Sequence, residues 1–220
     1  MFARLRAAIR LLRLHLSGRP STSQERFDLL FSALPDPWHF ERSPFEHERL
    51  SRLFQSFGGR RFQRALEVGC AEGTFTGRLA EVADHVTGLD VSEVALARAR
   101  TRHPSLTFVQ HDLGSGPLAE PPFDLVVASE VLYFFEDPGL LHRVADALVQ
   151  GLVPGGWLVL AHMRLLKDDT SGHARTWSGY PRMGAATVHP VFKSRADLRV
   201  LREDLYPLYA ICVLERTSSG

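Results

Sequence analysis

The distribution of apolar residues changes character near residue 60. From there on, short apolar runs alternate with stretches whose apolar residues are spaced as on one face of a helix. The predicted strands are residues 66–68, 85–89, 106–110, 123–128 and 156–161, and the predicted helices between them are 74–83, 92–102 and 138–152. Strands that alternate with helices predict a parallel sheet with right-handed crossovers.

Two further patterns flank this alternating region. Residues 198–205 and 208–215 are strand-like segments separated by a Tyr-Pro turn, which predicts an antiparallel hairpin at the sheet edge. On the N-terminal side, residues 24–34 form a predicted helix. Another helix begins after Ser43, with Pro44 in its first turn and Glu46 completing a capping box. We therefore expect N-terminal helices and a lid over residues 1–59, and one compact domain over residues 60–220.

The first 16 residues form an amphipathic pattern of their own. The apolar positions fall on one helical face and are flanked by Arg6, Arg10 and Arg13, with no acidic residue. Such a helix suits either an anionic membrane surface or packing on the domain or a second subunit. We favour packing. The arginines interrupt any secretory signal, so we expect a cytoplasmic protein, with peripheral membrane contact as the alternative.

Composition excludes several classes of protein. The 220 residues carry 26 Lys+Arg against 25 Asp+Glu, a net charge of +1, which gives no indication of nucleic-acid binding. Hydrophobic residues at 45% and charged residues at 23% are ordinary for a globular protein, and no apolar run is long enough to span a membrane. The two cysteines are expected to be reduced thiols, and the ten histidines form no metal motif, so no metal is expected.

The stretch "ALEVGCAEGTFTGRL", residues 65–79, is a strand, a small-residue turn and a helix start. Its pattern is E-x-G-x-x-x-G, and Ala71 stands where a dinucleotide site has its middle glycine. Glu67 and Glu72 would repel a pyrophosphate, at a cost of about 1 kcal/mol or more for like charges a few Å apart. The loop therefore favours a cationic ligand without phosphate, and S-adenosylmethionine (SAM) fits this description.

Acidic residues also follow the next two strands. Asp90 lies 21 positions after Gly69, a spacing at which a carboxylate accepts the ribose hydroxyls. Asp112 is placed to take the adenine amino group, with Leu113 against the ring. Because ligands bind at the carboxyl ends of parallel strands, the three sites together predict an adenosine-containing cofactor.

The motifs "LEVGCAEG", "GLDVSEVAL", "HDL" and "FDLVVASEVLYFFED" resemble those of class I SAM-dependent methyltransferases over about residues 60–215. The resemblance implies a Rossmann-like α/β fold: a mostly parallel seven-stranded sheet, a C-terminal antiparallel hairpin and helices on both faces. "DPWHFERSPFEHERL", residues 36–50, narrows the resemblance to the nodulation protein S family. Those methyltransferases act on the free amine of a partly deacetylated chitin oligosaccharide. Trp38 is then expected over the cofactor.

The candidate cofactor-binding residues lie in this N-terminal motif, in the glycine loop and at the strand ends. They are Trp38, Glu67, Gly69, Cys70, Ala71, Gly73, Asp90, Val91, Asp112, Leu113, Ser129 and Glu130.

The candidate catalytic residues are Glu130, Tyr133 and His162, just past the fourth and fifth strands. Glu130 can hold the methionine ammonium or an acceptor amine, Tyr133 can face the methyl group, and His162 can act as a base. Each has an ordinary alternative: a helix-dipole acid for Glu130, core packing for Tyr133 and a hydrogen-bonded strand end for His162. Trp177 and Tyr180 are either a flat face for a sugar or core anchors.

Three functions remain open on the sequence. The first is N-methylation of a primary amine on an amino sugar or deacetylated glycan. The second is O-methylation of a sugar or secondary metabolite. The third is a catalytically silent SAM-binding subunit that supports a partner protein. The sequence favours the first, because of the D-P-W and P-F-E-x-E-R motifs.

Overall fold

The computed structural model describes residues 23–118, 122–135, 137–164 and 183–218. The predicted arginine-rich helix at residues 1–16 lies outside these ranges, as do Trp177 and Tyr180.

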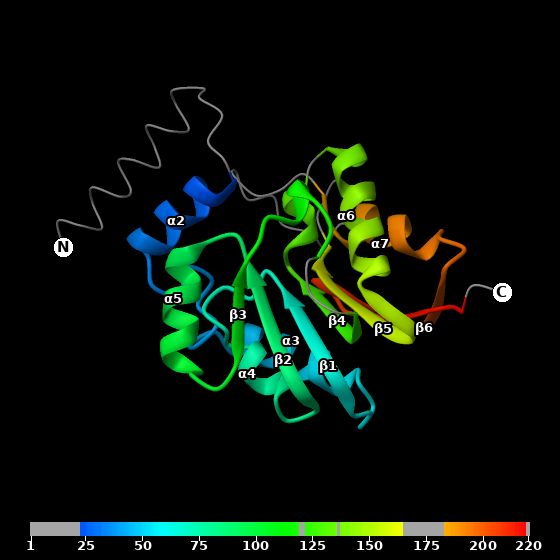
Figure 1. The fold of residues 1–220 in the computed structure, drawn as a ribbon, viewed down its shortest axis with the longest axis horizontal. Coiled ribbons are helices and arrows are strands. Elements are labelled where there is room, and N and C mark those ends of the chain that lie inside the picture. Colours follow the sequence, from blue (N-terminus) through cyan, green and yellow to red (C-terminus); the bar gives the residue numbers. More distant parts are fainter. Residues whose placement is uncertain (1–22, 119–121, 136, 165–182, 219–220) are drawn as a thin grey trace.

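The centre of the fold is one seven-stranded sheet with the strand order β3-β2-β1-β4-β5-β7-β6 (Figure 1). The strands from β3 to β5 pair in parallel, and β7 pairs antiparallel with both β5 and β6. The seven strands are β1 (Phe62–Val68), β2 (Ala83–Asp90), β3 (Thr107–Gln110), β4 (Phe123–Ser129), β5 (Leu152–Met163), β6 (Leu198–Leu205) and β7 (Tyr209–Arg216). The predicted Rossmann-like sheet with its terminal hairpin is confirmed.

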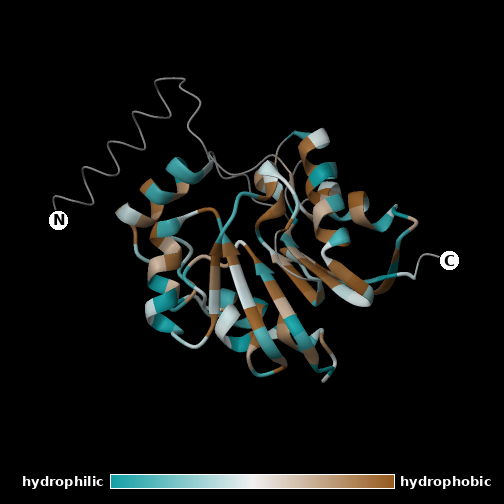
Figure 2. Cartoon of the chain, in the orientation of Figure 1, coloured by the Kyte–Doolittle hydropathy of each residue, from teal (hydrophilic) through white to brown (hydrophobic). Residues whose placement is uncertain are grey.

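Helices cover both faces of this sheet because the side chains of each strand point alternately to the two sides. On β1, Leu66 and Val68 pack in the cluster that includes α6 and α7, whereas Ala65 packs in the cluster that includes α3 and α4. Hydrophobic residues accordingly gather on the central strands, and the helices carry hydrophilic residues outward (Figure 2). The helices are α2 (Ser23–Ala33), α3 (Pro44–Gln55), α4 (Thr76–Leu79), α5 (Glu93–Arg102), α6 (Pro138–Gln150) and α7 (Ala185–Lys193), with the 3-10 turns η1 (Leu113–Ser115) and η2 (Leu132–Phe134).

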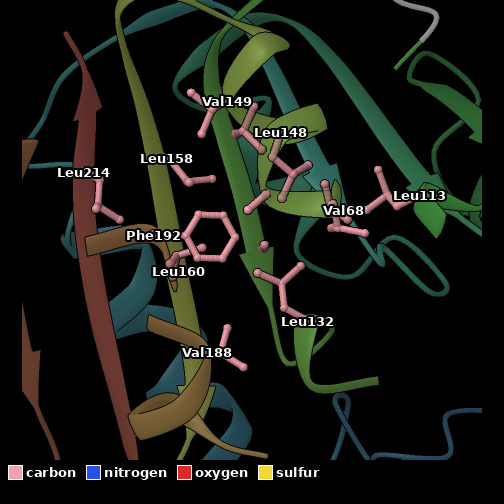
Figure 3. Close-up of a cluster of buried hydrophobic side chains, with 14 of the residues drawn as sticks. Val68, Leu113, Leu132, Leu148, Val149, Leu158, Leu160, Val188, Phe192 and Leu214 are labelled. Carbon is pink, nitrogen blue, oxygen red and sulfur yellow. The ribbon is translucent and has the colours of Figure 1, made fainter. Parts of the chain in front are cut away.

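The larger apolar cluster joins α6, α7 and η2 to the sheet (Figure 3). Phe192 of α7 lies fully buried against β5, and Leu132 of η2 is buried in the same cluster. Full burial of one such side chain contributes about 1.5–3 kcal/mol. The cluster therefore anchors the turn that follows β4 to the rest of the core.

Helix starts follow the predicted capping residues, with one correction. The Ser43 hydroxyl accepts the Glu46 amide, and the Ser92 hydroxyl accepts the Ala95 amide. The second half of the predicted capping box is wrong, because the Glu46 side chain pairs with Arg49 and the Ser43 amide binds the His39 carbonyl instead.

Several other elements also differ from the prediction. The helix expected over residues 74–83 shortens to α4, since the Phe62 amide pairs with the Val82 carbonyl and draws the following residues into β2. Strand β5 begins at Leu152 rather than at residue 156, because helix α6 ends at Gln150 and not at the predicted residue 152. Helix α7 was not predicted, and Pro190 inside it obscures the helical pattern in the sequence.

No helix within the described ranges combines the length and the apolar character that crossing a membrane requires.

Candidate active site

A cavity of about 330 Å³ opens at the carboxyl ends of β1, β2 and β4, where the chain order reverses between β1 and β4. Open α/β sheets bind their ligands at such a reversal. The segment from α2 to α3 supplies the other walls. Eleven of the twelve predicted cofactor residues line the cavity: Trp38, Glu67, Gly69, Cys70, Ala71, Asp90, Val91, Asp112, Leu113, Ser129 and Glu130.

The glycine loop is shaped by close backbone approach. Gly69 has φ +70°, and a Cβ there would lie 2.6 Å from Cγ2 of Val131 in the loop after β4. Ala71 also adopts a positive φ of 49°, which is unusual for a residue with a side chain. Gly73 does not line the cavity; a Cβ there would lie 3.1 Å from the Phe108 ring, so this glycine serves the packing of the loop.

Asp90 braces the same loop from the end of β2. Its Oδ2 accepts the Ala71 amide at 2.9 Å, and its Oδ1 accepts the Ser92 amide at 2.9 Å. Each carboxylate oxygen keeps a second lone pair that can accept from a ligand. Asp112 similarly accepts the Gly114 amide at 2.8 Å and lines the cavity together with Leu113. Both residues therefore stand where the sequence predicts them, held by backbone groups.

The two glutamates of the loop play different parts. Glu67 lines the cavity and accepts the Thr76 hydroxyl, and burial raises its pKa to about 8. A bound cation would favour its ionised form. Glu72 does not line the cavity and pairs with Arg98 at 2.6 Å and Arg102 at 3.7 Å. The expectation that Glu72 repels a pyrophosphate is therefore wrong, because its charge is already neutralised.

Glu130 occupies a strained position just after β4. Its φ is +55°, and its amide donates to the Ala161 carbonyl at 2.8 Å. The Tyr133 hydroxyl donates to Oε2 at 2.9 Å, whereas the buried Oε1 has no hydrogen-bond partner among the described residues. Burial raises the pKa of Glu130 to about 7, against the lowering influence of Arg49. A non-glycine residue held at positive φ commonly marks a functional site.

Arg49 is the main residue of the site that the sequence reasoning missed. Its side chain is 1% exposed and lines the cavity from α3. Nε and Nη2 donate to Glu46 at 2.9 and 2.7 Å, and Nη1 donates to the Ser129 hydroxyl at 2.7 Å. Although burial opposes it, Glu130 and Glu46 hold the pKa of Arg49 above its ordinary value. The P-F-E-x-E-R motif contains both Glu46 and Arg49 and was the signal available in the sequence.

His162 lies elsewhere than expected. It is fully buried and does not line the cavity. Its Nε2 accepts the Leu132 amide at 3.3 Å, and its Nδ1 lies 3.2 Å from Nε2 of His189. Burial holds the pKa of His162 well below its ordinary value. With both ring nitrogens engaged in this way, His162 is not available to act as a base.

Residues that precede β1 in the chain form one wall of the cavity. The Trp38 ring packs edge to face against Phe31 of α2, at a centroid distance of 5.3 Å. Asp28 of α2 accepts the Ser92 hydroxyl at 2.6 Å, and Arg98 donates to the Phe31 carbonyl at 2.8 Å. Helix α2 is thus tied to the start of α5, next to Asp90.

One group outside the cavity has the residue types of a metal site. A ring nitrogen of His189, the Cys212 thiol and a Glu203 carboxylate oxygen all lie within 4.8 Å of one another. Lys193, however, donates to both oxygens of Glu203, at 2.9 and 2.7 Å, and burial raises the pKa of the Cys212 thiol to about 12.

Comparison with known proteins agrees with this geometry. The family model described as Nodulation protein S (NodS) matches residues 22–203. Nodulation protein S of Bradyrhizobium diazoefficiens is 34% identical over 166 residues, covering 73% of this chain and 74% of that protein. Nodulation protein S of Rhizobium tropici is 36% identical over 145 residues; the match covers 64% of this chain and spans only 60% of that protein's length.

Among solved structures, the N-methyltransferase NodS from Bradyrhizobium japonicum WM9 in complex with S-adenosyl-l-homocysteine is similar, with a TM-score of 0.74 and 27% identity. The alignment covers 90% of this chain and 100% of that one. The fold and the site thus define a Rossmann-like, SAM-dependent methyltransferase. Within that class, the chain belongs to the nodulation protein S family.

Proposed function

We propose that this protein transfers a methyl group from SAM to a free primary amine on an amino sugar or partly deacetylated glycan. The observation that carries the proposal is the buried Oε1 of Glu130, which lacks a hydrogen-bond partner among the described residues. A buried polar atom left unpaired is costly, so its presence in a ligand cavity favours a ligand that donates to it. A protonated or neutral amine is such a donor.

The cavity residues fit SAM. Asp90 would accept the ribose hydroxyls, Asp112 the adenine amino group, and Leu113 would pack on the adenine ring. Arg49, which donates to the Ser129 hydroxyl, suits the carboxylate of the methionine portion, and Glu67 suits its ammonium. The cofactor supplies a methyl group already activated by its sulfonium, so the protein contributes alignment, charge and exclusion of water.

The acceptor side then requires a neutral amine nitrogen. Its lone pair forms the new carbon–nitrogen bond as the electrons of the carbon–sulfur bond pass to sulfur, and the amine must release one proton. In this proposal Glu130 would orient the amine and take this proton on Oε1, while the Tyr133 hydroxyl donates to Oε2. With a pKa of about 7, the carboxylate is suited to proton transfer near neutral pH.

The segment over residues 36–50 would act as a lid for the same site. Trp38 and Glu46 line the cavity from this segment, and α2 is fixed to α5 through Asp28 and Ser92. Closure over the cofactor would keep water from the sulfonium. Hydrogen exchange through residues 36–50 should slow when S-adenosylhomocysteine is added, and unchanged protection would contradict a lid.

The function is tested with labelled SAM and two chitin oligosaccharides, one with a free glucosamine amine and one fully N-acetylated. We expect label on the free-amine glycan alone. Label on the acetylated glycan alone would refute N-methylation and favour the O-methyltransferase alternative. Label on neither, together with intact binding of S-adenosylhomocysteine, would refute this acceptor class and leave the silent-subunit alternative standing.

A further inference from the structure

Two buried histidines lie directly behind the loop that carries Glu130. His162 belongs to β5, and His189 belongs to α7 and is 2% exposed. Their rings meet edge to face with centroids 5.3 Å apart, and neither residue lines the cavity. Val188, the neighbour of His189, lies in one apolar cluster with Leu132, so α7 and the loop share a core (Figure 3).

The hydrogen bonds of this pair fix where each proton lies. The Leu132 amide is a donor, so Nε2 of His162 must accept and carries no proton. The proton of a neutral His162 is then on Nδ1, which donates to Nε2 of His189 at 3.2 Å. Nε2 of His189 therefore accepts, and its proton is on Nδ1. Burial keeps both rings neutral, holding the pKa of His162 well below its ordinary value and lowering that of His189 to about 4.

At the Leu132 end of this chain of hydrogen bonds, the loop after β4 is held in a strained backbone conformation. Glu130 has φ +55°, a left-handed conformation that costs about 1–2 kcal/mol for a residue with a side chain. Such strain persists only where the surroundings determine the conformation. Two bonds flank it: the Glu130 amide to Ala161, and the Leu132 amide to His162. Loss of the second bond frees the loop on the side of Tyr133.

The geometry points to His189 as a positioning residue for the methyl-transfer site. It holds the tautomer of His162 that accepts the Leu132 amide, and it thereby keeps the Glu130 carboxylate and Tyr133 facing the cavity. This role rests on the proposed function of Glu130, but the proton positions do not. Neither histidine lines the cavity, so the role is one of positioning.

The same histidine also belongs to the group with Glu203 and Cys212, so metal binding is the competing role. Two observations favour the positioning role of His189 over metal binding. Lys193 already neutralises Glu203 through both carboxylate oxygens. In the tautomer derived above, the proton on Nδ1 of His189 leaves neither ring nitrogen free for a metal ion, since Nε2 accepts from His162.

The tautomers are tested first, without an acceptor substrate, by long-range ¹H–¹⁵N NMR on the full chain labelled at histidine. We expect the proton of His162 on Nδ1, unchanged between pH 5 and pH 8. In His189→Leu, the Leu132 amide should exchange with solvent at least about 10-fold faster, because its acceptor is no longer held. A proton on Nε2 of His162 in the wild type would overturn the inference, even if the protein methylates amines.

The positioning role is tested by steady-state kinetics on three variants of α7: His189→Leu, the conservative variant His189→Gln and the control Val188→Ala. His189→Leu should lower kcat about 10- to 100-fold with little change in the KM for SAM, as expected for a misplaced catalytic group. His189→Gln should restore most of it, because the glutamine carbonyl accepts where Nε2 did. Val188→Ala loosens the same helix without touching the bonds and should leave kcat unchanged.

Equal kcat losses in His189→Leu and Val188→Ala, or no rescue by glutamine, would show a merely structural role. One equivalent of zinc in the purified protein, lost in both Cys212→Ser and His189→Leu with the same fall in kcat, would assign the group to a metal and overturn positioning. Absence of methyl transfer to any amine would count against the proposed function, and the NMR result would still decide the tautomers.

Discussion

The two halves of the cavity are built in different ways. On the cofactor side, Asp90 and Asp112 follow their strands directly, and backbone amides within a few residues or in the adjacent loop hold their carboxylates. On the acceptor side, which would also face the methionine portion of SAM, Arg49 comes from α3 and binds Ser129, which lies 80 positions away in the chain. Glu130 on the same side is strained and has one oxygen without a hydrogen-bond partner among the described residues. The cofactor side is held by local chain geometry, whereas the acceptor side depends on contacts between distant segments.

This difference predicts that substitutions on the acceptor side lower the free energy of unfolding more than substitutions elsewhere. Arg49→Met should lower the free energy of unfolding by about 3–5 kcal/mol, because it removes a buried cation from beside the Glu46 and Glu130 carboxylates. Chemical denaturation measures the loss. Arg199→Met is the control: it breaks an exposed pair with Glu215, for which we expect at most about 1 kcal/mol. Equal losses in the two variants would contradict the comparison.

On the cofactor side, Asp90→Ala should weaken binding of S-adenosylhomocysteine by about 1–3 kcal/mol in calorimetry, the cost of a lost hydrogen bond to a charged group. Asp124 offers a matched control, because it also accepts two amides, those of Gln63 and Arg64 at 2.7 Å each, but at the opposite end of the strands. Asp124→Ala should destabilise the protein and leave cofactor affinity unchanged. An unaltered affinity in Asp90→Ala would move the ribose elsewhere.

A pH-dependent effect is expected at Glu67, whose pKa of about 8 lies above its ordinary value of 4.5. Below pH 4.5 the group is protonated in the folded and unfolded states. As the pH rises from there to about 8, the unfolded state loses the proton and the folded state keeps it, so stability falls. The fall is on the order of 1 kcal/mol per pH unit at most.

Glu67→Gln removes this contribution. The variant should therefore gain stability relative to the ligand-free wild type between pH 5 and pH 8, as followed by thermal unfolding. A difference between the two proteins that does not vary with pH would mean that Glu67 is ionised throughout and that its surroundings are more polar than its burial indicates.

The same contrast explains what the sequence could predict. The strand pattern and the residues directly after each strand located Asp90, Asp112 and the glycine loop, because in a parallel sheet these positions converge by topology alone. Glu72 was misjudged, since its partners Arg98 and Arg102 come from a helix whose facing could not be known. The pairing of Arg49 with Ser129 and of His162 with His189 depends on how α3 and α7 pack, which no local pattern records.

The central claim is that Glu130 receives the proton of an acceptor amine, and the pH dependence of kcat tests it most directly. It should be measured for wild type, Glu130→Gln and Glu67→Gln, each with two amine acceptors that differ in their own pKa. For the wild type and Glu67→Gln, kcat should rise through a pKa near 7 with both acceptors. Glu130→Gln should be about 10²-fold slower and lack this rise. A rise near pH 7 that persists in Glu130→Gln, at the wild-type rate, would contradict the claim.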